Sequence, residues 1–160
     1  SDDKNAEYNG APDKFKVNIE HLCSEIKRYD FNLRLSLNMT DEYDPIDAPR
    51  IFARAKELGA DQVTFRKLYK SDEDNPQDKW IDEHAVNEQF WTLTNRYVQE
   101  KGRKLEKLPF GAWKYSISEM SVVIDDDCMS TDVKEEMKYL ILRPNCKLYT
   151  KWDDEGSLLF

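Results

Sequence analysis

The amino-acid sequence predicts an α/β fold, because strand and helix patterns alternate along the first half of the chain. Residues 31–38 alternate without interruption between apolar and polar side chains, as in a strand with one buried face. A helical pattern that ends at Gly59 follows, and residues 62–69 then form a second strand pattern. The order strand, helix, strand is typical of a βαβ unit with two parallel strands.

The signals that begin and end helices support this order. Before the first strand, apolar side chains recur at helical spacing over residues 19–29. In the crossover helix, Asp47 is the expected N-cap and Gly59 the expected left-handed residue after the last turn. Residues 1–14 show no period and predict a polar linker or disordered end.

The second half of the chain continues with one helix and several shorter strands. Residues 80–101 predict a longer helix that ends at Gly102. Residues 113–117 alternate and residues 122–124 form a short apolar run, which favours strands. Pro144 and Asn145 suit the centre of a tight turn, so residues 138–152 predict a β-hairpin. We expect residues 15–160 to form a single α/β domain.

Composition narrows the functional classes. A chain of 160 residues with 39% hydrophobic and 35% charged residues is typical of a folded globular domain. The net charge of −8 argues against nucleic acid as a partner. No apolar run is long enough to span a bilayer, so we expect a soluble cytoplasmic protein without a membrane partner. The three widely spaced cysteines predict free thiols.

One group of polar side chains is the leading candidate for a binding site. Alternation places these side chains on one face of the two strands: Arg34, Ser36, Asn38, Thr64 and Arg66. Guanidinium groups bind carboxylates and phosphates, while hydroxyl and amide groups bind sugar hydroxyls. The pattern therefore suits a polar, anionic small molecule. The alternative is that these side chains face solvent or pair with some of the 32 acidic residues.

Other chemistry is weakly supported. Asp125–Asp127 with Asp132 could bind a hard cation, but their spacing matches no metal loop, and a solvated acidic loop is the simpler interpretation. His21 and His84 belong to no zinc-binding pair. Phosphate-loop, dinucleotide-binding and serine-esterase motifs are absent from the sequence. We therefore predict no catalytic residue and no metal ligand in this chain.

Three segments, residues 31–40, 51–66 and 140–149, together resemble the carboxyl-terminal half of radical S-adenosylmethionine (radical SAM) proteins. The shared features are a polar-lined strand, a helix ending in Leu-Gly, a strand with Thr-Phe-Arg and a late hairpin. They cover about residues 15–152. The resemblance implies a partial (β/α) barrel. It also implies that four side chains bind the ribose and carboxylate of the cofactor: Arg34, Ser36, Asn38 and Arg66.

The chain departs from that family at its defining feature. The Cys-x-x-x-Cys-x-x-Cys loop that holds the 4Fe-4S cluster is absent. In the late hairpin, no cysteine stands at the position where the family usually has one. We therefore expect the distal part of a longer enzyme whose missing N-terminal half carries the cluster. The parent protein would bind S-adenosylmethionine and the 4Fe-4S cluster, whereas this chain alone would bind neither and have no activity.

Two further expectations follow from this interpretation. An open strand edge left by the missing half could pair with a second copy and give a homodimer. Substrate choice would depend on loops such as residues 71–79 and 105–112. The alternative function is a self-standing α/β module that binds a small ligand or another protein.

Overall fold

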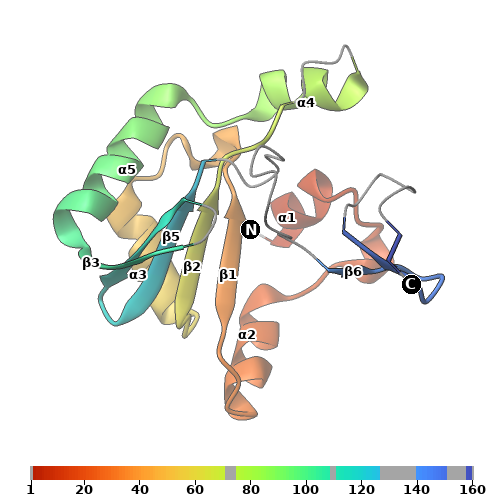
Figure 1. Cartoon of the computed structure of the whole chain (residues 1–160), viewed down its shortest axis with the longest axis horizontal. Helices are drawn as coiled ribbons and strands as arrows, with labels where there is room; N and C mark the ends of the chain where they lie inside the picture. Colours follow the sequence, from red (N-terminus) through yellow and green to blue (C-terminus); the bar gives the residue numbers. More distant parts are fainter. Residues whose placement is uncertain (1, 71–74, 109–110, 127–139, 151–157, 160) are drawn as a thin grey trace. The chain divides into compact units, whose positions relative to one another are not determined.

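The computed structural model describes residues 2–70, 75–108, 111–126, 140–150 and 158–159 (Figure 1). The chain divides into two compact units, Ser1–Cys128 and Met129–Phe160, which are described separately below. The expectation of a single domain over residues 15–160 stays a prediction. Among the described helices, none combines the length and the hydrophobicity that a bilayer-spanning segment needs.

An open, mixed sheet of five strands forms the centre of the first unit, with the order β1-β2-β5-β4-β3. The first three of these are parallel: β1 (Arg34–Asn38), β2 (Gln62–Arg66) and β5 (Met120–Asp125). The other two continue the sheet antiparallel: β4 (Trp113–Ile117) and β3 (Arg103–Lys107). The predicted α/β class and the parallel pair are confirmed, although both strands are shorter than predicted. The described strands do not close into a barrel.

The crossover helix α3 (Ala48–Glu57) has the two end signals that the sequence predicts. At its start, the Asp47 side chain accepts a hydrogen bond from the backbone N–H of Arg50 at 3.0 Å. At its end, Gly59 has a φ of 76°, and the N–H of Ala60 donates to the carbonyl of Ala55. This reversal ends the helix and directs the chain into β2.

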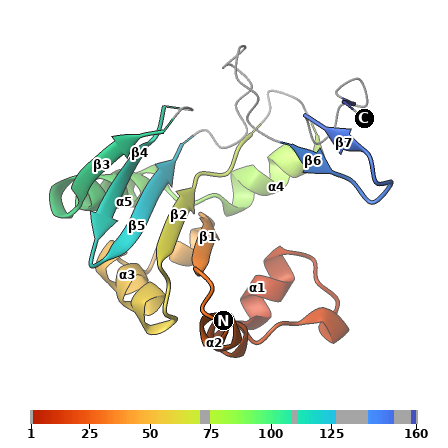
Figure 2. The ribbon, with the colours of Figure 1, turned by 60° about the horizontal axis from the view of Figure 1, so that its bottom comes forward.

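The hydrophobic core lies on one face of the sheet. Helices α3 and α5 (Glu88–Lys101) both cover this face, as the two views in Figures 1 and 2 agree. Val63, Phe65 and Val122 point into this core from the strands and are at most 1% exposed. Because β1, β2 and β5 alternate in burial, the opposite face carries their polar residues.

The predicted single helix over residues 80–101 is wrong. Two helices occupy this region, α4 (Pro76–His84) and α5. Between them, the N–H of Val86 donates to the carbonyl of Met39, which holds the junction against the end of β1. The Asn87 side chain then accepts the N–H of Phe90 at 2.8 Å and begins α5. A tertiary contact and a new N-cap therefore override a continuous helical pattern.

The N-terminal segment is also more ordered than predicted. Instead of a linker, it forms α1 (Asp2–Tyr8) and a 3-10 turn, η1 (Asp13–Phe15). The Tyr8 hydroxyl donates to Asp41 at 2.7 Å, in the 3-10 turn η2 (Asp41–Tyr43). The predicted helix over residues 19–29 is confirmed as α2 (Ile19–Arg28). Specific contacts with later parts of the chain thus order a segment whose own pattern is weak.

The described part of the second unit is a β-hairpin of β6 (Ile141–Leu142) and β7 (Leu148–Tyr149), as predicted for residues 138–152. The N–H of Cys146 donates to the carbonyl of Arg143 at 2.9 Å, closing a turn with Pro144 and Asn145 at its centre. The outer parts of the predicted hairpin, residues 138–139 and 151–152, lie outside the described residues.

Candidate polar binding face

Three rows of side chains, all polar except Val123, cross the parallel strands on the face of the sheet opposite the core. Paired residues of neighbouring parallel strands carry their side chains on the same face, so the register defines each row. The rows are Arg34–Gln62–Ser121, Ser36–Thr64–Val123 and Asn38–Arg66–Asp125. No residue of these rows belongs to the described core cluster.

The predicted candidate residues share this face. Arg34, Ser36 and Asn38 are exposed on the edge strand β1, and Thr64 and Arg66 are half-buried on its neighbour β2. The register places Ser36 beside Thr64 and Asn38 beside Arg66. The predicted grouping is therefore confirmed, while the binding role of these side chains stays a prediction.

The row at the carboxyl ends of the strands is the most distinctive. Asp125, the last residue of β5, is 8% exposed and pairs in register with Arg66. The Nε of Arg66 is buried and has no hydrogen-bond partner among the described residues. Buried polar groups in folded proteins are nearly always bonded, so this N–H is suited to an acceptor that a ligand supplies. A guanidinium and a carboxylate thus lie side by side.

Asp125 is the neighbour of Arg66 in the sheet, a position that the sequence analysis missed. It was assigned to an acidic loop over residues 125–127, whereas it ends a strand. The signal that could have identified it is the spacing of Ser121 and Asp125, which share one face if residues 120–125 form a strand. Asp127, Cys128 and Asp132 lie outside the described residues, and no described group of three acidic, histidine or cysteine side chains is placed to hold a metal ion.

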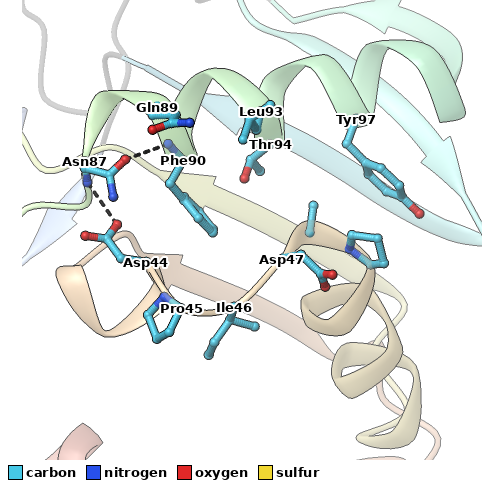
Figure 3. A pocket seen from close by; sticks show the side chains of 12 residues that line it. Asp44, Pro45, Ile46, Asp47, Asn87, Gln89, Phe90, Leu93, Thr94 and Tyr97 are labelled. Carbon is cyan, nitrogen blue, oxygen red and sulfur yellow. Dashed lines mark hydrogen bonds between the residues drawn. The ribbon is translucent and has the colours of Figure 1, made fainter.

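The first unit also has a groove on its helix-covered side, between residues 44–49 and α5 (Figure 3). Its volume is about 500 Å³. The N–H of Asn87 donates to Asp44 at 3.0 Å and so ties one end of the groove together. Phe90 and Thr94 are buried in the wall, whereas Leu93 is 52% exposed. The sequence analysis did not predict this groove.

The two histidines lie in different surroundings. His21 is exposed on α2. The ring of His84 lies 4.6 Å from that of Trp80 and 5.7 Å from that of Tyr8, so this aromatic group joins α4 to α1. The nearby hydrogen bond from the Tyr8 hydroxyl to Asp41 raises the pKa of Tyr8 to about 12. Tyr8 is therefore a neutral hydrogen-bond donor at physiological pH.

The geometry of the polar rows sets their chemistry. Arg34 and Arg66 offer planar donors for carboxylate or phosphate, and Ser36 and Asn38 can bind hydroxyl groups. Asp125 can accept a hydrogen bond from an ammonium group.

Searches against protein-family models, characterised proteins and solved structures find no match to this chain.

Proposed function

We propose that the first unit is part of a (β/α) barrel wall and that its polar face binds S-adenosylmethionine in a radical SAM enzyme. The missing N-terminal half of that enzyme would carry the 4Fe-4S cluster. In this proposal, residues 34–38 and 62–66 supply the wall next to the cofactor, and this chain alone has no activity. The second unit stays without an assigned role.

The observation that carries the proposal is the placement of both crossover helices on one face of three parallel strands. Doubly wound sheets have helices on both faces, whereas (β/α) barrels have helices only on the outside. Here α3 and α5 both cover the apolar face. The three parallel strands also lie side by side in the order in which they follow along the chain, β1-β2-β5. Both features favour a barrel wall whose polar face turns inward.

The carboxyl ends of the strands suit the charged end of the cofactor. S-adenosylmethionine combines a ribose with an amino-acid group that carries a carboxylate and an ammonium. In the proposed arrangement, Arg66 binds the carboxylate through its unpaired Nε–H, and Asp125 accepts from the ammonium. Ser36 and Asn38 lie on the neighbouring strand, where they could bind the ribose hydroxyls.

The coding sequence upstream of Ser1 gives the first test. The proposal requires an open reading frame that continues upstream and encodes a Cys-x-x-x-Cys-x-x-Cys loop within about one further domain, roughly 100–150 residues. A frame that begins near Ser1, or an upstream segment without this loop, would refute the enzyme proposal.

Binding by the protein encoded by that full reading frame gives the second test. Arg66→Ala should weaken S-adenosylmethionine binding about 10- to 100-fold in equilibrium dialysis, because a charge-assisted hydrogen bond contributes about 1.5–3 kcal/mol. Arg103→Ala is the matched control, since Arg103 is exposed on β3 at the far edge of the sheet. Equal affinity of the Arg66→Ala variant and the control would contradict the assignment.

A self-standing α/β binding module is the second candidate function. One observation favours it: the first unit has its own hydrophobic core, to which the sheet and both crossover helices contribute. A reading frame that begins near Ser1, together with cooperative unfolding of the isolated chain, would support this candidate over the enzyme fragment.

A further inference from the structure

We propose that two copies of this chain pair through the free edge of β1, antiparallel and centred on Ser36. The pairing would join two five-stranded sheets into one continuous sheet. This inference concerns the main chain of an edge strand. It concerns this chain by itself, because in the proposed barrel the missing N-terminal half would cover the same edge.

The hydrogen-bond pattern of β1 shows which of its groups point outward. The N–H of Met39 donates to the carbonyl of Arg66, and the N–H of Gln62 donates to the carbonyl of Leu33. In a parallel ladder, alternate residues bond to the same neighbour. The odd-numbered residues of β1 therefore bond to β2, and the N–H and C=O groups of Arg34, Ser36 and Asn38 point away from the sheet.

These outward groups have no partner in the described part of the chain. β1 is an edge strand, and no described hydrogen bond reaches the N–H or C=O of Arg34, Ser36 or Asn38. An alternating row of free donors and acceptors is complementary to another extended backbone. The partner that fits this edge is consequently a β-strand.

The opposite edge of the sheet, formed by β3, is protected against pairing with another strand, and the β1 edge differs from it. β3 carries Arg103, Lys104 and Lys107, and its register shifts between Lys104 and Glu106. Basic residues and bulges are the devices that prevent pairing between sheet edges. β1 carries a single basic residue, Arg34, and no lysine or proline, and its register with β2 is regular. We infer that the β1 edge is kept open for pairing.

The sequence of β1 is complementary to itself in one antiparallel register. With Ser36 opposite Ser36 of the second copy, Arg34 lies opposite Asn38, and Leu35 lies opposite Leu37. The outward groups of residues 34, 36 and 38 then meet each other and can form about six main-chain hydrogen bonds. Polar side chains stay on the polar face, and no like charges oppose each other. A second copy therefore suits this edge.

Changing the charges of the residues that would lie opposite each other tests this register. Sedimentation velocity over a wide concentration range measures the mass and the dimer Kd. The unmodified chain should sediment with twice the mass of the monomer. Asn38→Arg places two guanidinium groups opposite each other at two places in the dimer and should raise its Kd about tenfold, since opposed like charges destabilise a strand pair. Adding Arg34→Glu makes both pairs oppositely charged and should restore the Kd of the unmodified dimer.

Two further variants keep the test decisive. Ser36→Pro removes the central outward N–H without touching the bonds to β2, and an edge strand tolerates such a proline, so dimer should be lost while the circular dichroism spectrum is kept. Gln99→Arg adds the same charge on an exposed part of α5 and should leave the dimer intact.

A monomer at every concentration, or a dimer that survives both Ser36→Pro and Asn38→Arg, would overturn the pairing. Because the readout is mass rather than ligand binding, either result leaves the proposed cofactor site untouched.

Discussion

The two faces of the sheet in the first unit differ completely, although the same three strands form both. On one face, Phe65 and Val122 are fully buried beneath α3 and α5. On the other, Arg66 and Asp125 lie side by side without an ion pair among the described residues. A step of one residue along a strand moves from one face to the other. Stability and chemistry are thus separated by the alternation of the strand.

Truncation in the covered face should have the largest effect. Phe65 is 0% exposed and its ring packs against that of Phe52, with centroids 5.6 Å apart. Phe65→Ala should lower the free energy of unfolding by about 3–5 kcal/mol, because it leaves a cavity in the core. Urea denaturation measures this loss. Thr64→Ala, one residue away on the open face, should change it by less than about 1 kcal/mol. Similar losses for both would remove the distinction between the faces.

A part-buried hydrogen bond beside the core should have the second-largest effect. The indole N–H of Trp91 donates to Asp126 at 2.7 Å and joins α5 to the residue after β5. Trp91→Phe should cost about 2 kcal/mol, since it removes a hydrogen bond to a charged group and some packing. Thermal unfolding followed by circular dichroism gives the measurement. The Asp126→Asn variant keeps an acceptor and should lose less stability; an equal loss would argue against the bond.

The hydrogen bonds of Asp61, which align the starts of β1 and β2, should contribute less to the free energy of unfolding. Asp61 accepts hydrogen bonds from the backbone N–H of Leu33 at 2.7 Å and from Lys27 at 2.8 Å. Its side chain is 37% exposed, so solvent screens the ion pair. Asp61→Asn should therefore cost only about 1 kcal/mol in urea denaturation. Lys27→Ala should cost less than this, because the Leu33 bond remains, and the reverse order would contradict the assignment.

The pH dependence of the same contact should be the smallest effect. The Lys27 ammonium, and then the Leu33 N–H, lower the pKa of Asp61 below its usual value of 3.8. Above that value Asp61 is charged in both the folded and the unfolded chain, and its contribution is complete. As the pH falls further, the unfolded chain takes up the proton first and the contribution is lost. The stability difference between the original chain and Asp61→Asn should shrink below pH 3.8; a constant difference would count against this cause.

Local signals predicted much of the α/β part of the fold. Alternation located β1 and β2, and Asp47 and Gly59 marked the ends of the helix between them. The same alternation placed Arg34, Ser36, Asn38 and Arg66 on one face, as the register has it. These features depend on residues that are close in sequence, which is why a single sequence contains them.

The features that sequence analysis missed depend on contacts between distant residues. The break before α5 requires the bond from Val86 to Met39, and α1 is held by the bond from Tyr8 to Asp41. The pairing of β3 with β4, and of β5 with β2, was likewise beyond a local pattern. For the same reason Asp125 was not recognised as the neighbour of Arg66.

The connection between β2 and α5, residues 67–87, is hydrogen-bonded to the sheet at both of its ends. It leaves where the N–H of Lys67 donates to the carbonyl of Asp125, and it returns where the N–H of Val86 donates to Met39. Closing a longer loop between fixed ends costs little additional entropy. Insertions before α4 can therefore accumulate during evolution without disturbing the strand register. The scaffold could thus acquire new recognition elements beside the ends of β1 and β2 at little expense in stability.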